Sequence, residues 1–189
     1  MSSQRSIQRA KRCAQALWSA NICGSKWVDK VKPDGSLKSR LVVQGFTQVW
    51  LKDYHDTFSA VASMTTFRIL INVSAILGCD IFTIDVSQAY TEGELLDDIY
   101  VQAPRSHPLP KGVAYKLRRP SYGTKQAGRC WYLHVTKTLR SLGLNQLCKD
   151  SCLFVKMSDS KPSLIITMRL SSSSTKNFPE FTKFRNSKG

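Results

Sequence analysis

An aspartate and an aromatic ring follow a short apolar run of the chain. Asp85 stands at the end of residues 79–86, and Tyr90 comes five positions later. A carboxylate where a buried strand ends can hold a divalent metal ion, and a ring close behind it can control what binds beside that metal. We therefore take Asp85 as a candidate metal-binding residue and Tyr90 as its selective neighbour. An ordinary core tyrosine remains the alternative for Tyr90.

The charge of the chain is large and unevenly distributed. Its 189 residues hold 28 Lys and Arg against 13 Asp and Glu, a formal net charge of +15. So many positive charges repel one another unless a polyanion neutralises them, so nucleic acid is the expected partner. Residues 69–104 hold six acids and no Lys or Arg, whereas residues 99–149 hold ten Lys or Arg and no acid. An acidic metal or nucleotide pocket beside a basic track fits this pattern, and so do two solvated faces of opposite charge.

The cysteines and histidines indicate no separate catalytic or metal site. Six cysteines form no Cys-x-x-Cys pair, which is typical of a reducing compartment, and Cys148 and Cys152 have no nearby partner for zinc. The histidines have no obvious acid or nucleophile partner, so we assign no catalytic role to His55, His107 and His134.

The first 28 residues are basic and contain no acid. This composition is typical of a mitochondrial targeting peptide, but a basic tail that contacts phosphates, or a leader without function, looks the same. We favour a cytoplasmic or nuclear location. No apolar stretch reaches the roughly 20 residues that cross a bilayer, so we expect no membrane partner.

Apolar periodicity predicts alternating short strands and helices. Residues 26–32 and 37–46 are predicted to form a basic hairpin around residues 33–35. A helix capped by Thr65 or Thr66 is predicted to end at Gly78 and to precede the strand that carries Asp85. Its predicted apolar side is Phe67, Leu70, Ile71, Ser74 and Leu77. Further predictions are strands at 98–102 and 113–117, a helix at 129–142 with Trp131, Val135, Leu139 and Leu142 on one stripe, and a hairpin of 153–157 with 164–168.

Several stretches match a known family in order and nearly in spacing. The main ones are Arg40-Leu41-Val42-Val43-Gln44-Gly45-Phe46-Thr47-Gln48, Asp53-Tyr54-His55-Asp56-Thr57-Phe58-Ser59, Ile99-Tyr100-Val101-Gln102-Ala103-Pro104 and Tyr122-Gly123-Thr124-Lys125-Gln126-Ala127. Residues 24–28, 64–66, 85–90, 129–132 and 150–156 add further matches. Over residues 24–168 the chain resembles the reverse transcriptase domain of copia-type retrotransposon polyproteins.

The resemblance implies a nucleotidyl transfer site. Such a polymerase uses two Mg²⁺ ions about 3.5–4 Å apart, held by converging carboxylates, of which Asp85 matches the first. Tyr90 matches the aromatic gate under the sugar. Arg40, with Lys38 as neighbour, matches the cation over the incoming dNTP, because a guanidinium forks onto phosphate oxygens. Residues 36–39 lead into Arg40 more directly than in the family, so a solvated basic turn remains the alternative.

The resemblance also implies a site for an RNA or DNA template-primer. Tyr122, Gly123, Lys125 and Gln126 match the segment under the template base, where a glycine lets backbone approach a base and a lysine can meet phosphate. Four neighbouring positions depart from the family: Pro120, Ser121, Thr124 and Gly128.

The largest departure follows Met168. Where the family continues into Tyr-Val-Asp-Asp with the remaining metal-binding acids, this chain reads Arg169-Leu170-Ser171-Ser172. We therefore expect a fragment of an RNA-directed DNA polymerase that is inactive as this chain, with a frameshift near Met168 as one origin. The alternatives are a basic nucleic-acid-binding remnant without catalysis and a vestigial protein that barely folds.

The expected fold class is α+β, a partial fingers and palm with a small antiparallel sheet backed by helices. We divide the chain into a basic extension at residues 1–23, the partial reverse transcriptase region at 24–168, and a disordered tail at 169–189.

Overall fold

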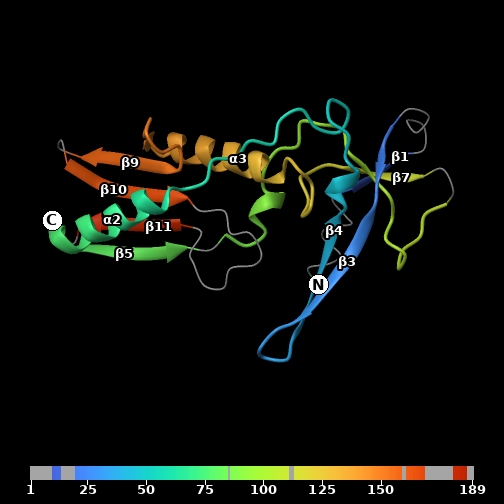
Figure 1. The fold of residues 1–189 in the computed structure, drawn as a ribbon, viewed down its shortest axis with the longest axis horizontal. Coiled ribbons are helices and arrows are strands. Elements are labelled where there is room, and N and C mark those ends of the chain that lie inside the picture. The colour runs from blue at the N-terminus through green and yellow to red at the C-terminus, as the bar shows by residue number, and fades with distance from the viewer. Residues whose placement is uncertain are drawn as a thin grey trace. The chain divides into compact units, whose positions relative to one another are not determined.

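The computed structural model describes residues 10–13, 20–84, 86–110, 113–158, 161–168 and 181–186. The chain divides into two compact units, Met1–Phe58 with Gln88–His134 and Ser59–Ser87 with Val135–Gly189. Helices and small sheets of antiparallel and mixed strands give the α+β class, which confirms the prediction (Figure 1). Within the described residues, no helix has the length and apolar character that crossing a membrane requires.

The first unit contains a four-stranded sheet in the order β1-β7-β6-β2. Its strands are β1 (Ala10–Cys13), β2 (Ile22–Cys23), β6 (Tyr100–Val101) and β7 (Ala114–Leu117). β7 pairs antiparallel with β1 and β6, whereas β2 runs parallel to β6. The strand predicted at 113–117 is confirmed as β7, and the one predicted at 98–102 is shorter than expected.

A long two-stranded ribbon in the same unit is the predicted basic hairpin (Figure 1). It consists of β3 (Ser25–Val31) and β4 (Leu37–Val43), paired from Ser25 opposite Val43 to Val31 opposite Leu37. Gly35 has a φ of 77°, which the turn requires and which glycine adopts without strain. β4 ends before residue 46 because the chain turns into the 3-10 helix η1 (Gly45–Thr47).

Apolar side chains hold this unit together where the ribbon meets the sheet. Cys23, Val43, Ile99 and Val101 are all buried and pack as one cluster, with Leu95 and Leu117 against its side. Burial raises the pKa of the Cys23 thiol, which therefore behaves as a small apolar side chain at neutral pH.

The second unit contains a five-stranded antiparallel sheet in the order β5-β11-β10-β9-β8. Its strands are β5 (Cys79–Ile84), β8 (Asn145–Gln146), β9 (Leu153–Ser158), β10 (Lys161–Met168) and β11 (Phe181–Asn186). The predicted hairpin of 153–157 and 164–168 is confirmed as β9 and β10.

The helix α2 (Met64–Leu77) precedes β5 in this unit and ends as predicted. Gly78 caps its C-terminus in the left-handed region, at φ 62°. The prediction of Thr65 or Thr66 as N-cap is wrong, because the Ser63 hydroxyl accepts the Thr66 amide and both threonines lie inside the helix. Of the predicted apolar side, Leu70 and Ser74 are buried and Leu77 is exposed.

The helix α3 (Ala127–Ser141) contributes residues to both units. Trp131, Val135 and Leu139 are buried along one stripe, as the periodicity predicts. Leu142 is exposed, because it follows the end of the helix. Leu144 is buried instead, and its amide donates to Leu139 O at 3.1 Å.

Strands form in both the predicted N-terminal extension, residues 1–23, and the predicted tail, residues 169–189. β1 and β2 lie within residues 1–23, and β11 lies within residues 169–189. Within the segment that the sequence sets apart as a tail, Phe181–Asn186 pairs with both β5 and β10. Main-chain hydrogen bonds to two open strand edges form this strand, and composition alone does not reveal such edges.

Candidate functional site

Three of the predicted site residues lie together in the first unit. The Arg40 guanidinium lies 5.3 Å from the centre of the Tyr122 ring, a cation–π arrangement. The Tyr90 and Tyr122 rings meet edge to face, with 5.4 Å between their centres and 89° between their planes. The residues come from β4, from the 3-10 helix η2 (Ala89–Thr91) and from the turn before α3. Tyr122 therefore joins the predicted triphosphate cation to the predicted sugar gate.

Backbone contacts fix the turn that carries Tyr122 against β4. The Val43 amide donates to Tyr122 O at 2.8 Å, and Gly123 follows with a φ of 88°. A Cβ at Gly123 would collide with Val43 O, and one at Gly45 would collide with Gly123 O. Gly123 therefore packs closely against the backbone of β4, and its approach to a template base stays a prediction.

Lys125 and Gln126 contact a different loop of the same unit, residues 48–55. The Lys125 ammonium lies 4.6 Å from the centre of the Tyr54 ring and donates to its hydroxyl at 3.0 Å. The Lys125 amide donates to Gln48 Oε1 at 2.7 Å. Lys125 is exposed, whereas the Gln126 side chain is almost fully buried, at 1% exposure.

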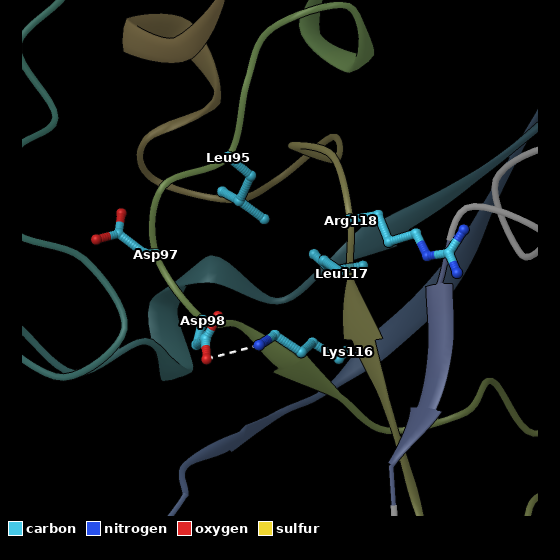
Figure 2. A pocket seen from close by; sticks show the side chains of 6 residues that line it. All are labelled: Leu95, Asp97, Asp98, Lys116, Leu117 and Arg118. Carbon is cyan, nitrogen blue, oxygen red and sulfur yellow. Dashed lines mark hydrogen bonds and ion pairs between the residues drawn. The ribbon is translucent and has the colours of Figure 1, made fainter.

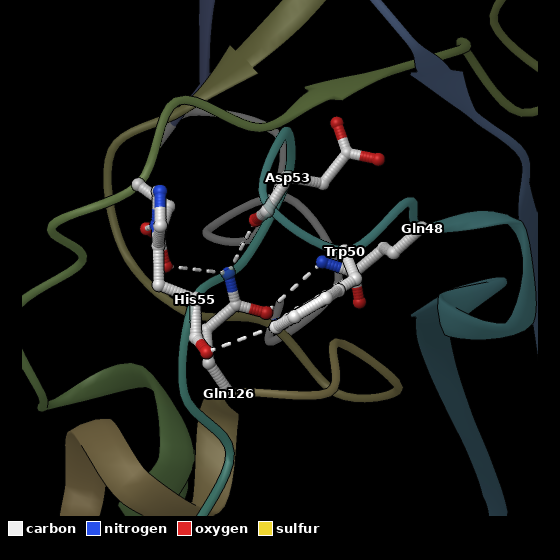
Figure 3. A network of polar contacts seen from close by, with 6 residues as sticks. Gln48, Trp50, Asp53, His55 and Gln126 are labelled. Carbon is white, nitrogen blue, oxygen red and sulfur yellow. Dashed lines mark hydrogen bonds and ion pairs between the residues drawn. The ribbon is translucent and has the colours of Figure 1, made fainter.

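The buried Gln126 side chain is the centre of a hydrogen-bond network, which we call the Gln126 network (Figure 3). Its Nε2 donates to Asp53 O at 2.9 Å and to Asp97 Oδ2 at 3.0 Å, and its Oε1 accepts from Gln48 Nε2 at 2.9 Å. The members of the network are Asn21, Gln48, Asp53, His55, Asp97 and Gln126. A template contact by Gln126 stays a prediction, and in the structure both donors and the acceptor of its amide are engaged within the protein.

Asp53 and His55 complete this network, and sequence reasoning missed both. Asp53, which is 2% exposed, accepts from Val49 N at 2.7 Å and from Asn21 Nδ2 at 2.5 Å. His55 Nδ1 lies 2.9 Å from Asp97 Oδ1, so the expectation that His55 lacks an acid partner is wrong. The two residues of that pair are 42 positions apart, and nothing local in the sequence indicates the contact.

Lys38 and Asp85 are two further residues that the sequence predicts for the site. Lys38 is exposed on β4, where it pairs across the ribbon with Lys30. Asp85, the predicted catalytic and metal-binding residue, lies outside the described residues. Its role therefore stays a prediction.

The described acids do not gather into a metal site. Among the residues that the structure describes, no three His, Cys, Asp or Glu side chains form a group that could hold a metal ion. Several carboxylates instead contact basic groups of the protein: Asp56 pairs with Arg129 at 3.0 Å, and Asp98 with Lys116 at 2.6 Å.

An open pocket of about 520 Å³ lies around the Asp98–Lys116 pair (Figure 2). Its lining is Leu95, Asp97, Asp98, Lys116, Leu117 and Arg118. None of the predicted site residues lines this pocket, and Asp97 belongs to it and to the Gln126 network. The mixed charges of its lining give no preference for an anion or a cation.

Comparison with known proteins identifies the family. Residues 18–181 match the family model described as reverse transcriptase (RNA-dependent DNA polymerase). The chain is 34% identical over 138 residues to the retrovirus-related Pol polyprotein from transposon TNT 1-94 of Nicotiana tabacum. The matched region covers 69% of this chain and 10% of that protein. It is 37% identical over 142 residues to the retrovirus-related Pol polyprotein from transposon RE1 of Arabidopsis thaliana, with 71% and 10% covered.

A more distant relative is the transposon Ty1-LR2 Gag-Pol polyprotein of Saccharomyces cerevisiae, 27% identical over 139 residues, with 70% of this chain and 8% of that protein covered. The chain spans about a tenth of the length of the curated relatives it matches. No solved structure matches it. Because the family model matches most of the chain and the plant polyproteins are more than 30% identical to it, the chain belongs to the reverse transcriptase family of copia-type retrotransposon polyproteins.

Proposed function

We propose that this chain supplies nucleotide- and nucleic-acid-binding residues of a retrotransposon RNA-directed DNA polymerase but does not by itself catalyse nucleotidyl transfer. The observation that carries the binding part is the contact of both Arg40 and Tyr90 with the Tyr122 ring. Arg40 can bind phosphate and Tyr90 can contact a sugar, and both contact the same ring, as a nucleotide site requires.

Each side chain has a role in this proposal that follows from its chemistry. Arg40, with Lys38 on the same strand, contacts the triphosphate of a dNTP, and Tyr90 excludes the 2′-hydroxyl of its sugar. Tyr122 and Gly123 lie under the template base, and Lys125 contacts a template phosphate. Gln126, buried beside Lys125, supports this segment from within the protein.

The family generally uses a divalent metal, and the described residues do not fit a binuclear Mg²⁺ centre. They contain no group of three possible ligands. Asp85 would then face two divalent ions with Arg169, Leu170, Ser171 and Ser172 in place of the family's Tyr-Val-Asp-Asp. One carboxylate cannot offset two such cations, which repel each other at about 4 Å. We therefore derive no catalytic step for this chain.

Primer extension tests the absence of catalysis. The full chain is incubated with a poly-rA template, a complementary primer, dTTP and Mg²⁺, beside an Asp85→Asn variant. We expect no incorporation above the level of that variant. Incorporation by the unmodified chain that Asp85→Asn abolishes would overturn the proposal, since it would show that Asp85 supports a working metal centre.

A second candidate function is nucleic-acid binding without any nucleotide site, and the net charge of +15 favours it. Both functions predict a gel shift with an oligonucleotide that weakens as salt is added. Only the first predicts that a dNTP protects Tyr90 or Tyr122 from nitration. The absence of a gel shift at low salt would exclude both functions.

A further inference from the structure

The register of β3 and β4 gathers four cations on one face of the ribbon. Lys26 lies opposite Val42, Val28 opposite Arg40, and Lys30 opposite Lys38. Opposed residues, and every second residue along each strand, point to the same side of a sheet. Lys26, Lys30, Lys38 and Arg40 therefore share a side that carries no acid, and we call these four residues the cationic face.

The other side of the ribbon has a different composition and is attached to the unit. Its residues contain no Lys or Arg and are Ser25, Trp27, Asp29, Val31, Leu37, Ser39, Leu41 and Val43. Val43 is buried in the core, and Trp27 Nε1 donates to Ser106 Oγ at 2.8 Å. The basic residues of the ribbon are thus sorted by face, with the opposite face neutral or acidic.

The cationic face sets two like charges directly against each other. Lys30 and Lys38 are cross-strand partners, and both are exposed. Like charges directly opposite one another destabilise a strand pair, by roughly 0.2–1 kcal/mol. An anion laid across the two strands would convert this repulsion into attraction. The pairing therefore has a physical reason if the face binds a polyanion.

The length of the face indicates which polyanion it fits. Lys26 and Lys30 are four residues apart on one strand, about 13 Å at roughly 3.3 Å per residue. One end of the face reaches Arg40, which lies against Tyr122. Cations spread over that distance need several phosphate groups in a row to neutralise them.

We propose that the cationic face binds the phosphate backbone of a single nucleic-acid strand along the ribbon. Lys26 and Lys30 then join Lys38 and Arg40 in one phosphate track that ends beside Tyr122. This deepens the proposed function, on which it rests, by adding two residues and by naming a strand backbone as their ligand. A nucleotide triphosphate shares the chemistry and is the alternative source of phosphate.

The salt dependence of binding measures the contacts. Affinity of the full chain for a fluorescent 20-nucleotide single strand is measured by anisotropy over a series of salt concentrations. Each phosphate contact contributes about 0.7 to the slope of log K against log salt. The double variant K26Q/K30Q should therefore lower that slope by about 1.4. A matched control, K52Q/K137Q, removes the same charge from exposed lysines outside the ribbon and should leave the slope almost unchanged.

Competition separates the two sources of phosphate. An unlabelled strand should displace the labelled one at a far lower phosphate concentration than inorganic tripolyphosphate does. Equal competition per phosphate would assign the face to a triphosphate and overturn the strand proposal. An equal loss of slope in K26Q/K30Q and K52Q/K137Q would also overturn it, while leaving binding by net charge intact. No binding by the unmodified chain would defeat the proposed function itself.

A stability measurement guards against a variant that fails to fold. In K30Q the repulsion from Lys38 is removed, so its thermal midpoint without oligonucleotide should equal or exceed that of the unmodified chain, while its affinity falls several-fold. A lower midpoint together with unchanged affinity would overturn the proposal, because Lys30 would then support the fold and not the ligand.

Discussion

The Gln126 network and the cationic face are both polar regions of the first unit, yet they are built in opposite ways. In the network, buried donors meet acceptors: the Gln126 amide alone makes three hydrogen bonds of 2.9–3.0 Å. On the cationic face, Lys30 meets Lys38, a charge of the same sign. The difference shows where this chain requires internal pairing and where it tolerates repulsion.

Burial explains the contrast. Gln126 and Asp53 are 1% and 2% exposed, so an unmet polar group there would lose its water without replacement. Lys26, Lys30 and Lys38 are exposed, and water and salt screen their repulsion. A buried polar region must be satisfied within the protein and so supports the fold, whereas an exposed cationic region can bind a ligand.

The largest effect is expected in the network. Gln126→Leu would leave Gln48 Nε2 without its acceptor and Asp53 O and Asp97 Oδ2 without their donor. We expect the free energy of unfolding to fall by about 3 kcal/mol or more, measured by urea unfolding. Gln102→Leu, at an exposed glutamine, is the control and should change little. A loss below about 1 kcal/mol in Gln126→Leu would mean that the network is not essential to the fold.

A smaller effect links the network to pH. Burial first, and then the Asp97 carboxylate, raise the pKa of the Cys130 thiol to about 11 from its ordinary 9.0. The thiol loses its proton at a lower pH in the unfolded chain than in the folded chain. Its contribution to the free energy of unfolding is therefore fully present below pH 9 and is lost as pH rises towards 11.

Cys130→Ala should therefore reduce the loss of stability between pH 8 and pH 10 by about 1 kcal/mol, measured by urea unfolding at both values. Cys148→Ala, at an exposed cysteine, is the control and should keep the original loss. An unchanged pH dependence in Cys130→Ala would show that the thiol ionises equally in the folded and unfolded chain.

The smallest effect concerns the loop that presents Asp53 and His55 to the network. Leu51 in that loop has a φ of 63° and is 61% exposed. The left-handed conformation costs a residue with a Cβ roughly 1–2 kcal/mol, which exceeds the roughly 0.5–1 kcal/mol of entropy that glycine loses.

Leu51→Gly should therefore raise the free energy of unfolding, by about 0.5 kcal/mol in urea. Leu96→Gly, at an exposed leucine whose φ is not positive, should lower it. A loss of stability in both variants would mean that Leu51 makes contacts that outweigh its strain.

Local patterns in the sequence predicted much of the fold. The ribbon, the end of α2 at Gly78, β7, the β9–β10 hairpin and the buried stripe of α3 were all expected, because periodicity, turn residues and caps act within a few positions. The family resemblance also named Arg40, Tyr90 and Tyr122 before any geometry was known. It could not say that Arg40 and Tyr90 both contact the Tyr122 ring.

What the sequence by itself determined are the elements, the excess of positive charge and the family. Only the tertiary structure decided that Gln126 is buried among Gln48, Asp53 and Asp97, that His55 has an acid partner, and that residues 181–186 form a strand between β5 and β10. Gln48 and Gln126 are 78 positions apart. Contacts of that range depend on how whole elements pack, and no window of neighbouring residues carries the information.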